Sequence, residues 1–213
     1  MTPKRLEKFQ RVIQQSQGNI TVVLENVHDT HNIGAVLRSA DSIGIREIYV
    51  VYTEEKHSRD YLKLGKRTSG GTRKWVQVNY YNDIDACYKA VKTKYDKILG
   101  TYLKEGEAST SMFELDLTQS IALVFGNEAK GMTQKSIDYC DGNFVIPQAG
   151  MVTSLNISVA CAVTLYEAYR QRLAKNYYDE NPTLTPDDLI KLEEKFEVNN
   201  KIHMSTWRAP RID

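Results

Sequence analysis

The chain has 213 residues, of which 41% are hydrophobic, and this suits one α/β domain with short extensions and a substantial core. The 28 basic and 27 acidic residues leave a net charge of +1, so net charge alone does not indicate a nucleic-acid partner. The three cysteines have neither metal-ligand nor redox spacing, and the N-terminus is unlike a signal peptide. No apolar run approaches the roughly 20 residues of a membrane span. Together these features predict a cytoplasmic protein with no membrane contact.

The predicted elements alternate between short apolar runs and stretches with helical periodicity. Strands are predicted at 20–24, 48–51, 76–80, 97–102, 120–125 and 143–146. Helices are predicted at about 3–16, 32–43, 83–94, 132–139 and 154–173. This alternation predicts an α/β fold in which a parallel sheet carries helices on both faces.

The tail contains one further predicted helix. Thr185 is placed to be its N-cap, Pro186 stands at the first helical position and Asp188 at the third. The residues beyond this helix, Trp207 to Arg211, are expected to be a disordered terminus, although a contact with a nucleic acid is an alternative.

Basic residues are distributed unevenly along the chain. Residues 56–74 hold seven basic side chains against the single acid Asp60, and the first predicted helix and the end of the 154–173 helix are also basic. Acidic residues gather at 179–197. A basic face of this kind is what phosphate binding requires, and the simpler alternative is a solvated surface.

Three segments that follow predicted strands combine glycine with small polar residues. They are Asn-Ile-Gly-Ala-Val-Leu-Arg-Ser-Ala-Asp at 32–41, Phe-Gly-Asn-Glu-Ala-Lys-Gly-Met at 125–132 and Ile-Pro-Gln-Ala-Gly-Met-Val-Thr-Ser-Leu-Asn-Ile-Ser at 146–158. Ligands of open α/β sheets bind beyond the carboxyl ends of the strands, and glycine there lets the backbone approach a ligand closely. Each segment taken singly is also compatible with an ordinary strand-to-helix turn.

Taken together, in this order and at these separations, the three segments resemble the motifs of the SpoU family of RNA 2′-O-ribose methyltransferases, in the SPOUT superfamily. The resemblance covers about residues 20–172. Three further features are most similar to the TrmH subgroup, which methylates a conserved guanosine in the tRNA D-loop. They are the basic N-terminal helix, the Tyr-Glu-Ala-Tyr-Arg-Gln-Arg segment at 166–172 and the short C-terminal extension. The implied organisation is a basic helical extension at 1–19, a SPOUT methyltransferase domain at 20–174 and a C-terminal extension at 175–213.

The resemblance also implies properties that the residue pattern itself does not show. The C-terminal part of the sheet is expected to be threaded into a trefoil knot. The cofactor S-adenosylmethionine is expected to lie bent in the knotted crevice, held mainly by backbone groups, and the enzyme to be a homodimer whose active site combines both subunits. By the family pattern, the cofactor pocket is lined by Thr101, Gly126, Ile146, Met151 and Leu155.

Arg38 is the leading catalytic candidate. A sulfonium methyl group is already electrophilic, so the reaction needs no metal, and the protein must instead position a ribose 2′-hydroxyl and stabilise its developing negative charge. The Arg38 guanidinium can hold a substrate phosphate and stabilise that oxygen. Family proposals make this arginine the general base, but arginine stays protonated in proteins. A structural salt bridge is the simpler alternative.

The remaining catalytic candidates have polar side chains in the same three segments. Asn32 is expected to orient the ribose or the Arg38 segment, or to cap the helix that follows it. Glu128 is a conceivable base, but a carboxylate of ordinary acidity is a poor base for an alcohol, so an anchor for Asn32 or Arg38 is favoured. Ser154 and Asn156 stand where the long helix begins and can cap it or reach the substrate.

The predicted RNA contacts belong to the basic clusters and to the residue before the first motif. They are Arg11, His31, Lys66, Arg67, Arg73, Lys74, Arg170 and Arg172. His28 and His31 have an H-x-x-H spacing, but only Glu25 and Asp29 stand near enough to complete a ligand set, so no metal is expected. Residues 65–74 resemble a phosphate-binding loop without the P-loop order, and are expected to be an RNA-contacting loop or a solvated one.

Several other functions compete with this hypothesis. The chain lacks the G-x-G-x-x-G segment of a nicotinamide oxidoreductase and the G-x-S-x-G turn of a serine hydrolase. An RNA-binding module that has lost transfer activity and a ribosomal RNA 2′-O-methyltransferase stay open. Many of the latter enzymes carry an extra N-terminal RNA-binding domain, whereas this chain begins about 20 residues before its first predicted strand, which favours tRNA.

Overall fold

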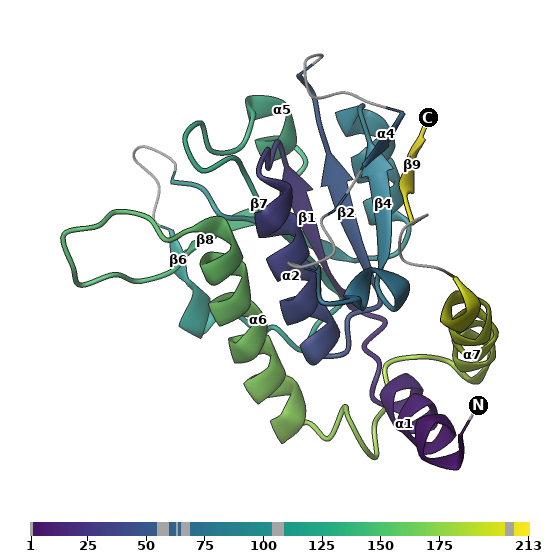
Figure 1. Cartoon of the computed structure of the whole chain (residues 1–213). Helices are drawn as coiled ribbons and strands as arrows, with labels where there is room; N and C mark the ends of the chain where they lie inside the picture. The colour runs from purple at the N-terminus through teal and green to yellow at the C-terminus, as the bar shows by residue number, and fades with distance from the viewer. Residues whose placement is uncertain (1, 55–59, 63, 65–68, 104–108, 203–206) are drawn as a thin grey trace.

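The structure is a computed structural model that describes residues 2–54, 60–62, 64, 69–103, 109–202 and 207–213. Within these residues a nine-stranded sheet forms the centre of the molecule, in the order β3-β9-β4-β2-β1-β7-β5-β8-β6 (Figure 1). The strands are β1 Ile20–Glu25, β2 Glu47–Val51, β3 Tyr61–Leu62, β4 Gln77–Tyr81, β5 Lys97–Gly100, β6 Thr110–Ser111, β7 Ile121–Phe125, β8 Gly142–Val145 and β9 Ala209–Ile212. All neighbouring strands are parallel except β3 and β9, so the predicted α/β class with a parallel sheet is confirmed.

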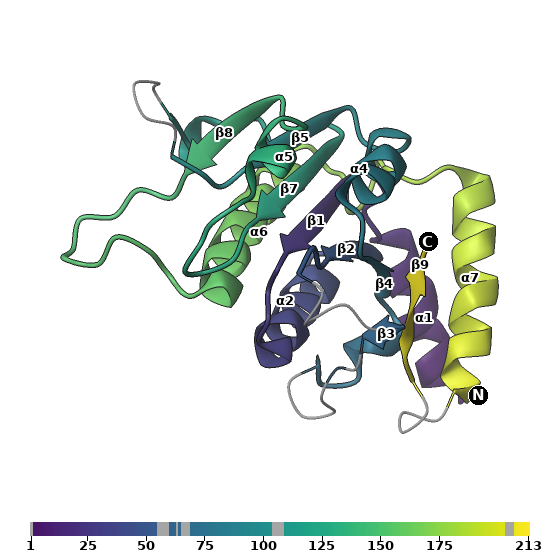
Figure 2. The same ribbon diagram turned by 90° about the horizontal axis from the view of Figure 1, so that it is seen from above.

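Helices cover both faces of the sheet. They are α1 Pro3–Gln14, α2 Thr30–Ser42, α4 Ile84–Lys92, α5 Gln134–Ile137, α6 Ile157–Ala174 and α7 Pro186–Lys201, with 3₁₀ turns η1 at Thr72–Lys74 and η2 at Met112–Glu114. Figure 2 shows α2 and α6 on one face and α4 and α5 on the other. Strand β1 is buried along its whole length because both of its faces are covered.

The alternation of side chains along β1 divides the core into two layers. Val22 and Leu24 pack in the cluster beneath α2 and α6, whereas Val23 packs in the cluster beneath α4. The pairing is fixed across the centre of the sheet, where Val23 lies opposite Tyr49 of β2 and Val124 of β7. Burial of these apolar side chains makes the main favourable contribution to the free energy of folding of the sheet.

The two extensions form a third, smaller core. Phe9 and Ile13 of α1 pack against Leu192 and Phe196 of α7. Trp75, which follows η1, joins this cluster with ring centroids 5.2 Å from Phe9 and 5.1 Å from Phe196. The cluster therefore ties both extensions to the segment that enters β4.

The structure corrects two predictions about local elements. The N-cap of α2 is Asp29, whose carboxylate accepts a hydrogen bond from the His31 amide, so the helix begins before Asn32. The tail beyond Trp207 is not disordered: Ala209–Ile212 forms β9, which pairs in parallel with β4 and antiparallel with β3.

Candidate functional site

Three of the predicted cofactor residues lie at the ends of neighbouring strands. Thr101 follows β5, Gly126 follows β7 and Ile146 follows β8, and these strands stand side by side in the sheet. Because the strands are parallel, their carboxyl ends meet at one edge, which is the ligand-binding edge of open α/β sheets. The Thr101 amide and hydroxyl both donate to the Val124 carbonyl, at 2.9 and 3.0 Å, and so tie the end of β5 to β7.

The segment after β7 is a compact turn that leaves no space for a side chain at Gly126. A Cβ atom there would lie 2.5 Å from the Gly131 carbonyl carbon and from the Met132 amide nitrogen. The Asn127 amide donates to the Gly131 carbonyl and the Gly131 amide donates back, at 3.0 and 2.8 Å. Gly131 has a φ of +70°, in the left-handed region that glycine adopts without strain. The turn therefore presents backbone groups at the sheet edge.

Asn32 joins the three glycine-bearing segments. Its Nδ2 donates a 2.7 Å hydrogen bond to Oε1 of Glu128 in the turn after β7. Its Oδ1 accepts a 3.2 Å hydrogen bond from Nδ2 of Asn156, at the start of α6. The side chain thus uses one donor and one acceptor to connect elements that are far apart in sequence, and the three segments converge on one place.

Asn156 is the N-cap of α6. Its Oδ1 accepts hydrogen bonds from the Ser158 amide at 2.9 Å and from the Ser158 hydroxyl at 2.6 Å. Capping and the contact with Asn32 therefore occur together in one residue. Ser154 lies before the helix in an exposed segment, where its hydroxyl is open to solvent.

Arg38 lies on α2, six residues beyond Asn32, which is about 9 Å along the helix axis at 1.5 Å per residue. Its side chain is exposed and lies beside Gly70, where an added Cβ atom would be 3.5 Å from Cδ and from Nε of Arg38. Gly70 has a φ of +52° and Gly71 a φ of +88°. Among the residues that the structure describes, Arg38 has no ion pair, so the salt-bridge alternative has no support there.

The segment between β8 and α6 presents apolar side chains to solvent. Met151 is fully exposed and Leu155 is half-buried. Leu103, which follows Thr101 beyond β5, is 81% exposed although it is a large apolar residue. Exposed apolar side chains on segments that leave the ends of β5 and β8 are available to an apolar part of a ligand.

The predicted RNA contacts differ in exposure. Arg11, His31 and Arg170 are exposed, and Arg170 pairs with Glu167 at 2.7 Å. Lys74 is half-buried. Lys66 and Arg67 lie outside the residues that the structure describes.

Arg172 is not placed to contact RNA, and that prediction is wrong for this structure. Its side chain is completely buried, and its guanidinium donates to the carbonyls of Leu117 and Gln119 and to the side chains of Gln17 and Asn19. Burial lowers the pKa of Arg172 to about 10. The residue instead fastens the C-terminal end of α6 to the start of β1 and to the segment before β7.

Arg73 is also buried, which contradicts its prediction as an RNA contact. Its Nη1 donates to the Leu64 carbonyl at 2.6 Å, and its guanidinium carbon lies 5.4 Å from the centre of the Trp207 ring. Burial lowers the pKa of Arg73 from its ordinary value. A guanidinium held in this way stabilises the η1 turn rather than a phosphate.

His28 and His31 do not form a metal site in the described structure. His28 lies 3.2 Å from the Glu54 carboxylate, and no group of three or more potential ligands is gathered among the described residues. Across that same part of the chain, no helix has the length and apolar character needed to cross a bilayer.

Glu25, a buried carboxylate at the end of β1, was indicated by the sequence only as an acid near His28 and His31, with no role at the site. It accepts hydrogen bonds from the Thr133 amide at 3.2 and 3.3 Å, just beyond the turn that contains Gly126. Burial raises the pKa of Glu25, and these hydrogen bonds oppose the rise only in part. An acidic residue at the end of an otherwise apolar strand was the available signal, because such a residue is seldom buried without a specific partner.

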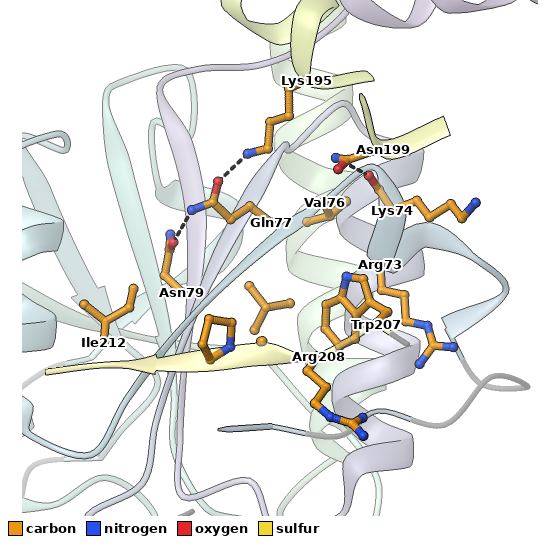
Figure 3. Close-up of a pocket in the computed structure, with 13 residues that line it drawn as sticks. Arg73, Lys74, Val76, Gln77, Asn79, Lys195, Asn199, Trp207, Arg208 and Ile212 are labelled. Atoms are coloured by element: carbon orange, nitrogen blue, oxygen red, sulfur yellow. Dashed lines mark hydrogen bonds between the residues drawn. The ribbon is translucent and has the colours of Figure 1, made fainter. Parts of the chain in front are cut away.

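Two cavities lie away from this edge of the sheet. One of 270 Å³ lies between β4, β9 and α7 and is shown in Figure 3, and one of 450 Å³ lies beneath α7 near the start of β2. We place the candidate site at the carboxyl ends of β5, β7 and β8 because the three motif segments converge there through named hydrogen bonds, which neither cavity shares.

Residues 19–166 match the SpoU rRNA Methylase family. The chain is 36% identical over 186 residues to a tRNA (guanosine(18)-2'-O)-methyltransferase of Thermus thermophilus, covering 87% of this chain and 92% of that protein. The crystal structure of the Aquifex aeolicus TrmH/SpoU tRNA modifying enzyme superposes with a TM-score of 0.81 at 31% identity, covering 94% and 98% of the two chains. AviRb of Streptomyces viridochromogenes, a SpoU methyltransferase crystallised with the cofactor AdoMet, gives a TM-score of 0.64 at 28% identity over 74% and 62%.

Proposed function

Because the chain belongs to the SpoU rRNA Methylase family, we propose that it transfers a methyl group from S-adenosylmethionine to a ribose 2′-hydroxyl of tRNA, at the conserved guanosine of the D-loop. The tRNA substrate is favoured over ribosomal RNA because the alignment with the tRNA-modifying relative extends over nearly the whole of both chains. The observation that carries the enzymatic proposal is the Asn32 hydrogen-bond pair, which unites all three motifs at the sheet edge.

The residues at the sheet edge fit the cofactor. The turn after β7 brings backbone groups to the edge because Gly126 has no side chain, and Thr101 and Ile146 flank it on the neighbouring strand ends. Leu155 and Met151 offer apolar contacts from the segment before α6. When bound there, S-adenosylmethionine supplies an electrophilic methyl group.

The protein's own task is to prepare the ribose oxygen. Arg38 presents an exposed guanidinium on a rigid helix, where it holds a substrate phosphate and stabilises negative charge as the 2′-oxygen loses its proton. Glu128 is engaged with the amide of Asn32, which supports a role as an anchor. The side chains of Asn32 and Asn156 are fixed by their mutual hydrogen bond and can hold the sugar in place.

The proposal includes a homodimer. Within one chain Arg38 lies six residues beyond Asn32 on α2, which places it about 9 Å along the axis and about 120° around the helix from the residue that joins the motifs. This separation supports an active site in which Asn32 comes from one subunit and Arg38 from the other. Val159, Val163 and Tyr166 form an exposed apolar stripe on α6 at helical spacing, which is a surface suited to such a contact.

The C-terminal trefoil knot and a cytoplasmic location complete the proposal. Both are expectations that the resemblance of the three motif segments to the SpoU family implies.

The test is to incubate the protein with labelled S-adenosylmethionine and total tRNA or ribosomal RNA, and to map the modified nucleotide. Label at the D-loop guanosine of tRNA is expected, and it must vanish when that nucleotide carries a 2′-deoxy sugar. Label in ribosomal RNA alone would replace the tRNA substrate by its alternative. Binding of tRNA without any binding of S-adenosylmethionine by calorimetry would indicate a non-catalytic RNA-binding module.

A further inference from the structure

The Arg38 side chain lies beside a short turn from another part of the chain. The turn comprises residues 70–74, which are Gly70, Gly71 and η1, and we call it the support turn. A Cβ atom added at Gly70 would lie 3.5 Å from Cδ and Nε of Arg38 and 3.9 Å from its guanidinium carbon, so the Arg38 side chain passes close beside the turn. A long, exposed arginine can adopt many rotamers, and contacts with a neighbouring surface favour some of these rotamers over others.

The support turn is held from its other side by the C-terminal extension. Nδ2 of Asn199, near the end of α7, donates to the Lys74 carbonyl at 2.8 Å. The Trp207 ring stacks against the guanidinium of Arg73, which is itself in the turn (Figure 3). Trp75, directly after the turn, is fixed in the aromatic cluster with Phe196 of α7. Three separate contacts thus connect the turn and the residue after it to Phe196, Asn199 and Trp207.

Strand β9 contacts residues 60–62, which lie before the support turn in the chain. Ala209 pairs with Leu62 of β3, both side chains are buried, and the Arg211 amide donates to the Asp60 carbonyl at 2.9 Å. On its other side β9 pairs with β4, where Arg211 lies opposite Tyr80. The strand therefore joins β4 to residues 60–62.

We propose that the C-terminal segment positions Arg38: Asn199 and Trp207 hold the support turn, and the support turn holds the guanidinium. The proposal rests on the proposed function insofar as Arg38 acts on the substrate. Asn199 and Trp207 are positioning residues, because they reach the reaction only through Arg38. Since a displacement of about 1 Å at a reacting group can cost roughly 100-fold in rate, loosening the turn is expected to lower the chemical step.

The test compares Trp207→Ala with Trp207→Phe and with Lys201→Ala, which alters an exposed residue at the end of α7. Trp207→Ala is expected to lower the single-turnover rate at saturating tRNA and S-adenosylmethionine by about 10- to 100-fold. Binding of S-adenosylmethionine should be unchanged. Trp207→Phe should recover most of the rate because it restores an aromatic face to Arg73, and Lys201→Ala should match the unmodified protein.

Two measurements need no substrate and follow the mechanism directly. Hydrogen exchange of the amides of Lys74, Trp75 and Val76, which are bonded within the turn, should accelerate in Trp207→Ala. The NMR order parameter of the Arg38 Nε–Hε group should fall. Both readouts remain decisive if the protein does not methylate tRNA, so failure of the proposed function and failure of this inference are distinguishable.

The inference is overturned by unchanged exchange and an unchanged Arg38 order parameter in Trp207→Ala. It is also overturned if tRNA binding weakens while the saturated single-turnover rate stays normal, since Trp207 would then be an RNA contact. If Trp207→Ala does not fold, Asn199→Ala removes one hydrogen bond to the same turn and is judged by the same measurements, with the same direction expected.

Discussion

Asn32 and Glu128 share a 2.7 Å hydrogen bond although 96 residues separate them in the chain. The bond has the Asn32 amide as donor and the carboxylate as acceptor, and a glutamine at position 128 would retain an acceptor oxygen at the same place. Substitution of Glu128 by glutamine can therefore distinguish a role as an anchor for Asn32 from a role as the base.

Glu128→Gln is expected to retain most of the methyl-transfer rate if the residue is an anchor, whereas Glu128→Ala should lose about 10- to 100-fold because Asn32 is released. The measurement is the single-turnover rate at saturating substrates. A Glu128→Gln variant as slow as Glu128→Ala would show instead that the carboxylate accepts the proton.

Arg38→Ala is expected to abolish detectable transfer, with a loss of at least about 100-fold, because it removes the group that stabilises the developing charge. Arg38→Lys keeps the charge but not the planar fork and should remain severely slowed. The fold and the dissociation constant for S-adenosylmethionine should be preserved in both variants. A near-normal rate in Arg38→Ala would remove this residue from the mechanism.

Gly126→Ala is expected to destabilise the protein by about 1–3 kcal/mol, since its Cβ would overlap the backbone of Gly131 and Met132. It should also weaken binding of S-adenosylmethionine, because the turn must move outward. Gly150→Ala is the matched control: an added Cβ there meets nothing within 4 Å. Thermal unfolding measures both variants, and equal melting temperatures for the two would contradict the crowding argument.

Arg172→Ala should destabilise the protein by about 3–5 kcal/mol, because it leaves two carbonyls and two amide side chains, all buried or half-buried, without their donor. Arg170→Ala, two residues earlier on the same helix, removes an exposed side chain and should leave the free energy of unfolding nearly unchanged. The expected effect of Arg170→Ala is weaker tRNA binding with a shallower salt dependence. Denaturant unfolding and binding titrations over a range of salt concentrations check the pair.

Glu25 predicts a pH dependence of stability. Its pKa is raised in the folded protein, so the folded state binds the proton more tightly than the unfolded chain does. This proton binding stabilises the folded protein at acid pH, and the stabilisation is lost as pH rises through the folded pKa. Glu25→Gln has no such proton but keeps an acceptor for the Thr133 amide. The free energy of unfolding of the unmodified protein, minus that of Glu25→Gln, should therefore fall from acid toward neutral pH. A difference that is constant with pH would show that Glu25 titrates normally.

The sequence predicted the central elements because their signals are local. Strands β1 and β7 are apolar runs covered on both faces, and helix α7 begins at Pro186 after its Thr185 cap as the pattern indicated. The cap of α2 was assigned to Asn32 instead of Asp29 because both residue types cap helices well. Only the distant partners Glu128 and Asn156 show that the Asn32 side chain is engaged elsewhere.

The remaining differences depend on contacts that no local pattern contains. Strands β3 and β9 are defined by each other and by β4, far away in sequence. Arg172 lies two residues from exposed Arg170, and two residues on an α-helix correspond to a rotation of about 200°, so the two side chains point to nearly opposite sides. A helical projection could have separated them, whereas the support of Arg38 by Gly70 follows only from the folded chain.

The register of the sheet also bears on how quickly the molecule assembles. Ile20 lies opposite Ile121 in the central pair of strands, and Tyr80 lies opposite Arg211 near the edge, so both pairings close long loops before they gain any stabilising contact. Parallel sheets of such high contact order fold slowly, over milliseconds to seconds or longer, and leave unpaired strand edges exposed meanwhile. Refolding from denaturant should accordingly succeed best at high dilution, where these transient edges meet fewer neighbours.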